Sequence, residues 1–337
     1  MSTQAVPGDA AADADDARAF AGRPYPDWFK AKGGGRSRLV SWWVPTVMVG
    51  LPILVIVCIV IYPTVWMFYH AFQNTNMMSL FTGNWSPVGW ANFATVLSSD
   101  RFHASLTHLA IYLTFGACLQ VLLGTALALI LYEFVRSNVL KTVLLILLVL
   151  PMMLPPSIVG VLWKFLLQAN NGAVNHLFIA LGFLDPTQRI EWLDTDLALW
   201  SLTMADTWQW TALPLLIVYS GRVSLPPAIY EAARVDGASR WLVMRRLTLP
   251  MLREIIAIAF IIRFMDAYKF VDKVYVMTSG GPAQSSELPV FIAFQKGIRE
   301  FQIGEAAAYA IIIFVFAAIL IVLFLQYLKR VLKAQGL

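Results

Sequence analysis

The stretch from Ser224 to Pro250 reads SLPPAIYEAARVDGASRWLVMRRLTLP, and it decides the interpretation of the whole chain. It predicts two short helices joined at a glycine. Ser224 can cap the first helix, and the Pro-Pro pair that follows suits a first helical turn. Asp236-Gly237 can end that helix, because glycine accepts the left-handed backbone of a helix end. Ser239 can then cap the second helix.

This predicted helical elbow has a surface suited to a protein partner. Ala232 and Ala233 let another backbone approach closely, and Glu231 and Arg234 offer charges beside them. Such a knob can fit a groove on a soluble protein and pass rigid-body motion to the helices it joins. The alternative is an amphipathic helix that lies on lipid headgroups and is held there by its arginines.

Outside the elbow, the composition is that of a membrane protein. The chain has 337 residues, of which 59% are hydrophobic and 13% charged. A soluble domain is closer to about half apolar and about a quarter charged. The net charge is +5, but the basic residues flank apolar runs and form no single patch. This distribution indicates membrane topology and argues against nucleic-acid binding.

Six apolar runs approach the roughly 20 residues that a membrane-spanning helix needs. The fourth run is more polar than those before it, and charges interrupt the fifth. The sequence therefore predicts an all-α integral membrane protein with about six transmembrane helices. The runs cover residues 43–68, 106–131, 142–167, 197–219, 255–277 and 306–328.

Lysines and arginines fix the expected orientation. They gather before the first run, between the second and third, between the fourth and fifth, and after the sixth. Because cytoplasmic loops are enriched in these residues, both termini are expected in the cytoplasm. Residues 1–40 are rich in Ala, Asp, Gly and Pro and are expected to be a disordered cytoplasmic tail. Residues 41–337 would form the transmembrane domain, with the elbow in its loop at 221–250.

The elbow resembles a segment of a known family. Its EAA, DGA and LP elements are similar to the EAA loop of the permease subunits of binding-protein-dependent ABC importers. The resemblance implies a type I ABC importer permease fold and a coupling helix that docks into a cleft of an ATPase subunit. Where that family carries an aromatic residue and an isoleucine further on, this chain has Met244 and Leu247. The coupling residues implied are Glu231, Ala232, Ala233, Asp236 and Gly237.

Four shorter stretches resemble the carbohydrate-type subgroup of these permeases. They are Tyr62-Pro63 and the segments 88–93 (VGWANF), 172–175 (GAVN) and 278–282 (TSGGP). The resemblance implies a sugar, polyol or sugar phosphate as substrate and a multi-pass location in the bacterial inner membrane. It also implies three protein partners: an ATP-binding subunit, a second homologous permease and an extracytoplasmic substrate-binding protein.

Polar residues at membrane depth are candidates for the substrate pathway. Placing them in the bilayer is energetically unfavourable, so a polar residue found there is expected to have a function. The fourth run carries a polar cluster, and charges recur at spacings of three and four along the fifth. The alternative for the fifth run is a ladder of ion pairs that is simply buried in the bundle. The pathway residues predicted are Asp206, Trp208, Gln209, Asp266 and Lys269.

Signs of an enzyme are missing from the sequence. It has no phosphate-binding loop and no nucleophile elbow, and His103, His108 and His176 have no metal-ligand spacing. We therefore expect no metal and no cofactor on this chain. The resemblance implies that ATP and Mg are bound by the partner ATPase. Two alternatives remain: a secondary transporter or channel driven by an ion gradient, and an importer subunit for a non-carbohydrate solute.

Overall fold

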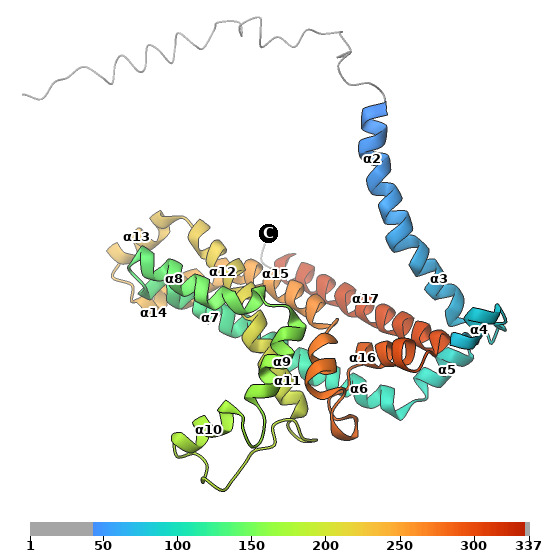
Figure 1. Cartoon of the computed structure of the whole chain (residues 1–337). Coiled ribbons are helices and arrows are strands. Elements are labelled where there is room, and N and C mark those ends of the chain that lie inside the picture. Colours follow the sequence, from blue (N-terminus) through green and yellow to red (C-terminus); the bar gives the residue numbers. More distant parts are fainter. Residues whose placement is uncertain (1–42, 334–337) are drawn as a thin grey trace, which may run out of the picture. The chain divides into compact units, whose positions relative to one another are not determined.

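The computed structural model describes residues 43–333, so the predicted tail at 1–40 lies outside the described residues. Within that range all regular secondary structure is helical, apart from one isolated β-bridge between Gln73 and Pro87 (Figure 1). It divides into two units, Met1–Pro63 and Thr64–Leu337, which are described separately. The all-α expectation is thereby met for the described residues.

The first unit contains the start of a long apolar helix. It consists of α2 (Trp43–Ile56), a π-helical segment η1 (Val57–Ile61) and the first residues of α3 (Tyr62–Ala71). The stretch Val47–Ala71 is long and apolar enough to cross a membrane. Its many exposed Val, Ile and Leu side chains are what a lipid-facing helix requires.

Two further helices in the second unit could cross a membrane without a break. The first is a 35-residue helix, Asp100–Phe134, built from α6 (Asp100–Ile111), the π-helical η2 (Tyr112–Ala117) and α7 (Cys118–Phe134). The second is Ile303–Gln326 within α17 (Ile303–Lys333). These helices cover the second and sixth predicted runs.

The third predicted run is bent, where the sequence predicts one membrane-spanning helix. It consists of α8 (Asn138–Val149), the 3-10 segment η3 (Leu150–Met153) and α9 (Pro156–Leu166). The two halves, 138–153 and 156–166, form an angle of 98°. Prolines at 151, 155 and 156 explain the bend, because each lacks a backbone donor and its ring clashes with the preceding turn.

The fourth run is helical, as α11 (Ala198–Trp210) with α12 (Ala212–Ser224). The fifth run, predicted as 255–277, is helical only in part, because α15 (Leu249–Ala267) ends at Ala267 and residues 268–271 are non-helical. The stretch 198–224 forms an angle of 69° with the following short helix, and the two count together as one bent candidate span. By length and composition alone, the described residues hold three spans, or up to five if each bent pair is one span. The charged α15 is not among them.

Short elements connect these helices. Before α6 lie α4 (Met77–Thr82) and α5 (Ala91–Leu97), and α10 (Ala173–Ala180) follows α9. The elbow comprises α13 (Pro227–Val235) and α14 (Arg240–Val243), which continues through the π-helical η4 (Met244–Thr248) into α15. After α15 come η5 (Val274–Thr278), η6 (Pro282–Gln284), α16 (Pro289–Phe294) and η7 (Gln295–Arg299).

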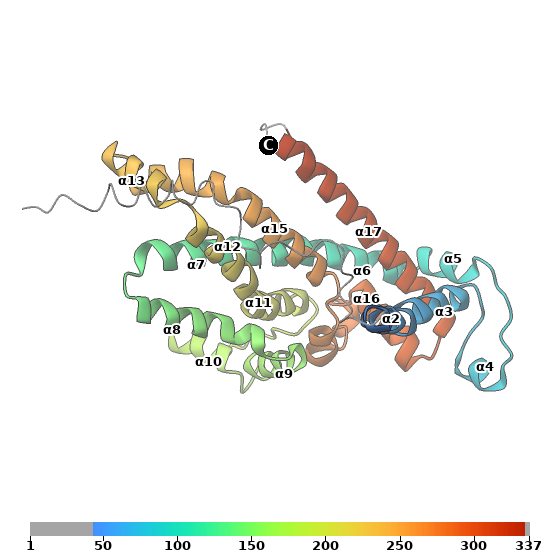
Figure 2. The same cartoon turned by 90° about the horizontal axis from the view of Figure 1, so that it is seen from above.

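Helix α12 packs between α7 and α15, and two glycines permit the close approach (Figure 2). A Cβ atom at Gly124 would lie 2.8 Å from the Leu215 backbone nitrogen, and one at Gly221 would overlap the Ile255 side chain. Small residues at such positions let helices touch along their backbones. The three helices therefore form one tightly packed group.

We predict that Gly124→Ala lowers the stability of the folded chain by about 1–3 kcal/mol, because the added methyl group overpacks a backbone contact. The measurement is the free energy of unfolding in detergent. Gly50→Ala is the matched control, because a Cβ at Gly50 meets nothing within 4 Å. Equal stability of the two variants would contradict the described packing of α7 on α12.

Candidate functional site

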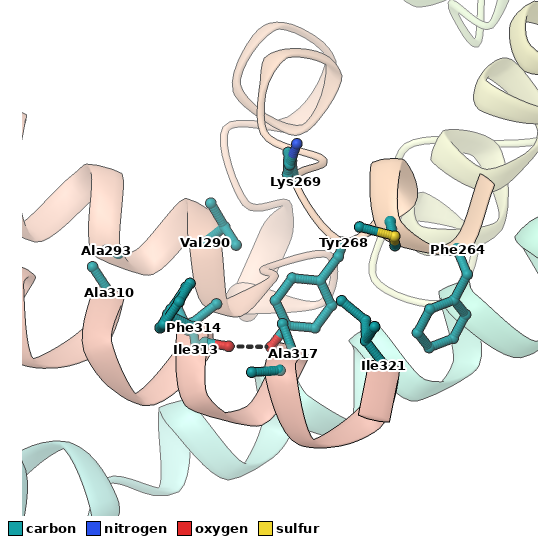
Figure 3. Close-up of a pocket in the computed structure, with 12 residues that line it drawn as sticks. Phe264, Tyr268, Lys269, Val290, Ala293, Ala310, Ile313, Phe314, Ala317 and Ile321 are labelled. Atoms are coloured by element: carbon teal, nitrogen blue, oxygen red, sulfur yellow. Dashed lines mark hydrogen bonds between the residues drawn. The ribbon is translucent and has the colours of Figure 1, made fainter. Parts of the chain in front are cut away.

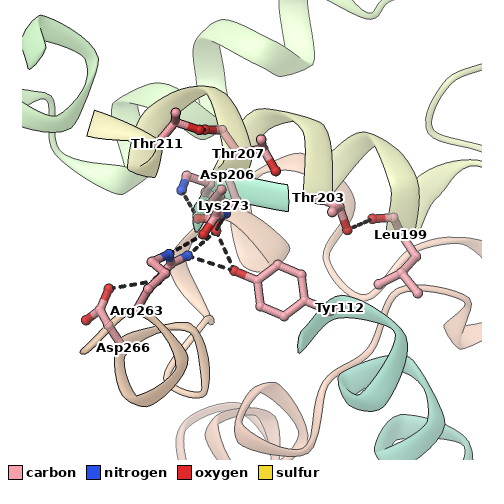
Figure 4. Close-up of polar contacts among 10 residues, drawn as sticks. Tyr112, Leu199, Thr203, Asp206, Thr207, Thr211, Arg263, Asp266 and Lys273 are labelled. Atoms are coloured by element: carbon pink, nitrogen blue, oxygen red, sulfur yellow. Dashed lines mark hydrogen bonds and ion pairs between the residues drawn. The ribbon is translucent and has the colours of Figure 1, made fainter. Parts of the chain in front are cut away.

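The Asp206 carboxylate in α11 is fully buried and accepts four side-chain donors (Figure 4). Lys273 Nζ lies 2.5 Å from its Oδ1 atom. The Tyr112 hydroxyl at 2.5 Å and Gln120 Nε2 at 2.9 Å donate to its Oδ2 atom. Arg263 donates to the same oxygen through Nη2. We call these five residues the Asp206 cluster.

The cluster joins parts of the chain that are distant in sequence. Tyr112 opens the π-helical segment η2, and Gln120 lies in the first turn of α7. Arg263 lies near the end of α15, and Lys273 directly precedes η5. Segments of π-helix often occur at functional sites, where the extra residue re-aims the side chains around it. Two of these segments flank the cluster.

The charges in the cluster are paired as burial demands. Arg263 and Lys273 are each 1% exposed, and both contact Asp206. Arg263 also pairs with Asp266 at 3.1 Å, and the Asp266 side chain is 41% exposed. An unpaired charge in this environment would be strongly unfavourable. The ion pairs therefore hold the helices together. The same charged groups also border a cavity.

The cavity beside the cluster has a volume of about 140 Å³. Its charged lining consists of three carboxylates and three cations, so their formal charges cancel. Two aromatic rings, Trp210 and Phe270, line it as well. Hydrogen-bonding groups beside aromatic faces suit a polar, uncharged ligand. The charged residues are Asp206, Asp266, Asp272, Arg263, Lys269 and Lys273.

The predicted pathway residues divide into two groups. Asp206, Asp266 and Lys269 line the cavity, whereas Trp208 and Gln209 do not. The Trp208 ring packs edge-on against Trp163, with 5.9 Å between centroids. Gln209 donates to the Leu154 carbonyl at 2.7 Å, and its Oε1 atom is buried without a hydrogen-bond partner among the described residues.

The structure adds four residues to those that the sequence analysis selected for the pathway: Tyr112, Gln120, Arg263 and Lys273. A glutamine inside the apolar run 106–131 was a signal for such a role, because an amide at membrane depth needs a partner. Tyr112 carried a weaker signal, since tyrosine is common in apolar runs. Of the ion-pair ladder considered for the fifth run, the structure forms the Arg263–Asp266 step.

A larger cavity of about 400 Å³ lies between α15, α16 and α17 (Figure 3). Its walls are almost wholly apolar. The Tyr268 hydroxyl that borders it donates to the Ile313 carbonyl at 2.9 Å. Few polar groups therefore remain to bind a polar solute there, and the smaller cavity is the better candidate site despite its size.

The elbow forms the two predicted helices, with one correction. Pro226 is the N-cap of α13, so the prediction that Ser224 caps it is wrong. Ser224 ends α12 instead, and its hydroxyl donates to the Gly221 carbonyl at 2.8 Å. As predicted, Asp236-Gly237 ends α13: Asp236 is its C-cap, and Gly237 follows with a φ of 71°. Ser239 caps α14 by accepting from the Leu242 amide.

Most of the elbow's predicted coupling residues lie on the surface. Glu231, Ala232, Asp236 and Gly237 are exposed, whereas Ala233 is buried on the inner face of α13. Large apolar side chains accompany them, since Val235 is 88% exposed and Trp241 71% exposed. Exposed apolar groups rimmed by charges are typical of a surface that binds a partner.

Comparison with known proteins places this geometry in context. Residues 120–333 match the family described as binding-protein-dependent transport system inner membrane component. A probable ABC transporter permease protein of Sinorhizobium fredii is 34% identical over 68% of this chain and 72% of its own length. The trehalose/maltose transport system permease protein MalF of Thermococcus litoralis is 31% identical over 65% of this chain and 72% of its own length.

A solved structure has the same fold. It belongs to a bacterial ABC transporter involved in the import of the acidic polysaccharide alginate. The TM-score is 0.75 at 19% identity, over 86% of this chain and 96% of the other. At this identity the likeness concerns the fold.

We predict that Asp206→Asn destabilises the chain by about 3–5 kcal/mol, because it leaves Arg263 and Lys273 buried without their shared carboxylate. The free energy of unfolding in detergent measures the effect. Asp185→Asn, at an exposed position, is the control and should behave like the unmodified chain. An unchanged stability of Asp206→Asn would mean that the carboxylate does not hold the cluster together.

Proposed function

This chain belongs to the family of binding-protein-dependent transport system inner membrane components, and from that premise we propose that it is the permease subunit of an ATP-driven sugar importer. The exposed elbow around α13 carries the proposal. It lies inside the matched region, presents Glu231 to solvent and turns sharply at Gly237. The alternative of an ion-gradient-driven transporter assigns this elbow no role.

A neutral sugar or polyol is the substrate that the site favours. One relative is named for trehalose and maltose transport, and neither sugar carries a charge. The cavity beside Asp206 combines balanced charges with two aromatic rings. Hydroxyl groups can exchange hydrogen bonds with the carboxylates, and a sugar face can pack on a ring. Because the formal charges of this lining cancel, it offers a sugar phosphate no net electrostatic attraction.

The proposed topology has six crossings, with both termini and the tail 1–40 in the cytoplasm of a bacterial cell. The arginines between the fourth and fifth runs support it, because they lie in and around the elbow, and cytoplasmic loops are enriched in basic residues. The elbow then meets an ATP-binding subunit that holds ATP and Mg. A second homologous permease completes the pathway, and an extracytoplasmic binding protein delivers the solute. This chain itself has no catalytic role.

Helix continuity supplies a mechanical route from the elbow to the cavity. From Arg240 the chain runs as helix through α14, η4 and α15, and it reaches Arg263 of the Asp206 cluster without a break. A displacement of α13 is passed through the turn at Gly237 to this continuous helix, 240–267, which we call the rod. Helices transmit such motion as rigid bodies, because packed interfaces switch between discrete arrangements and do not deform continuously. ATP-driven movement of the elbow would thereby rearrange the cavity.

We predict that Glu231→Ala abolishes sugar uptake and substrate-stimulated ATP hydrolysis while the chain still inserts into the membrane. The reason is that the substitution removes the exposed carboxylate that we expect to contact the ATPase. Both rates are measured in proteoliposomes that contain the full complex. Glu191→Ala, another exposed glutamate, is the control. Normal uptake by Glu231→Ala would refute the coupling role.

We also predict that Asp266→Asn or Lys269→Gln lowers kcat/KM for uptake roughly tenfold or more, since a hydrogen bond to a charged group contributes about 1.5–3 kcal/mol. Association with the ATPase should stay unchanged, because both residues lie at the cavity and far along the chain from the elbow. Asp196→Asn, at an exposed position outside the cavity, is the control. Unaltered uptake kinetics would remove both residues from the pathway.

A further inference from the structure

Arg222 is a buried cation at the end of α12, only 4% exposed. Its Nε and Nη2 atoms lie 2.9 Å and 2.5 Å from the same oxygen, Oε1 of Glu133. Glu133 is the penultimate residue of α7, and its side chain is 32% exposed. The ion pair therefore joins the end of α12 to the end of α7.

Two tyrosine rings hold the same guanidinium. Its central carbon lies 4.0 Å from the ring centroid of Tyr132 and 4.0 Å from that of Tyr230. A guanidinium is planar and weakly hydrated, so it stacks on aromatic faces better than an ammonium does. Tyr132 belongs to α7 and Tyr230 to α13. Arg222 is thus the common contact of three helices.

Tyr230 attaches the elbow in a second direction as well. Its hydroxyl donates to Thr248 Oγ1 at 3.3 Å, and Thr248 ends η4, directly before α15. Tyr230 and Ala233 are the buried residues of α13, so this ring is the main anchor of the helix. Only Leu225 and Pro226 separate α12 from α13 along the chain. A loop that short still allows α13 to pivot unless its side chains hold it.

We propose that Arg222 is a positioning residue that fixes the angle of α13 relative to α7 and α12. With Arg222 in place, a displacement of α13 also moves the ends of α7 and α12. Without Arg222, α13 can rotate about the loop at 225–226, and its displacement is not transmitted to the cavity. This inference rests on the proposed function, because it assigns the force at α13 to a partner ATPase.

The side chain of Arg222 suits a positioning role because it combines an ion pair with aromatic stacking. The ion pair holds the guanidinium to Glu133, and the rings of Tyr132 and Tyr230 each contact it at 4.0 Å. A lysine would keep the charge but lose the flat face and the two-nitrogen contact with Glu133. The close packing at Gly221, next in sequence, ties the same end of α12 to α15. The anchor of α13 therefore lies beside the close contact between α12 and α15.

The test uses the assembled importer in proteoliposomes, with sugar uptake and ATP hydrolysis measured together. We expect Arg222→Gln to hydrolyse ATP while the sugar transported per ATP falls about tenfold, within the usual range of coupling between sites. Arg222→Lys should fall between that variant and the unmodified complex. Arg136→Gln is the matched control, because it removes an exposed positive charge close to Glu133 in sequence.

The ratio of uptake to hydrolysis does not depend on the amount of folded complex. A variant that only lowers the stability of the complex therefore leaves this ratio unchanged. An unchanged ratio in Arg222→Gln would overturn the proposal. If that variant fails to assemble, Tyr230→Leu decides, because it removes one ring and retains the Arg222–Glu133 pair. An unchanged ratio there would overturn the proposal equally. Absence of uptake and hydrolysis in the unmodified complex would instead overturn the proposed function.

Discussion

The carboxylate of Asp206 is the constraint on which the arrangement of the second unit depends. Lipid tails are as apolar as leucine, so hydrophobic burial alone does not decide which helices pack together in a bilayer. Buried charges do decide it, because each must find its partner. Two cations from different segments, Arg263 and Lys273, share this one carboxylate. The end of α15 and the start of η5 are thereby fixed against α11, and the cavity opens where they meet.

The Asp206 cluster is joined to the elbow through continuous structure. The rod from Arg240 to Ala267 carries Arg263 at one end and begins at the elbow at the other. Close contacts at Gly124 and Gly221 clamp α12 between α7 and this rod. Such packing transmits displacement with little loss, since protein interiors are as dense as organic crystals. The Asp206 cluster and the elbow therefore lie at opposite ends of the packed helices α7, α12 and α15.

The sequence predicted the helices well because apolar runs report burial or lipid contact directly. It did not predict the 98° bend between 138–153 and 156–166, although the three prolines there were visible. Prolines are tolerated in straight membrane helices when neighbours satisfy the freed carbonyls, so their presence alone does not distinguish a bend. The cap of α13 was misplaced for a related reason. A serine two residues before a proline can end one helix as readily as begin the next, and only the fold selects between them.

Arg263 lowers the mean apolar character of α15, yet its position supports α15 as a membrane helix once the two faces of the helix are considered separately. Ile258, Ile262 and Met265 are 49%, 43% and 44% exposed, at spacings of four and three. Ala259, Arg263 and Ala267 are buried, at spacings of four. Arg263 thus lies on the inner face, and an apolar stripe lies outside, which is the reverse of a soluble amphipathic helix. Two other charges of α15 are less buried: Glu254 near its start is exposed, and the side chain of Asp266 near its end is 41% exposed. A hydropathy average mixes the two faces, whereas lipid contacts only the outer one. This pattern supports α15 as the crossing that completes the six-helix proposal.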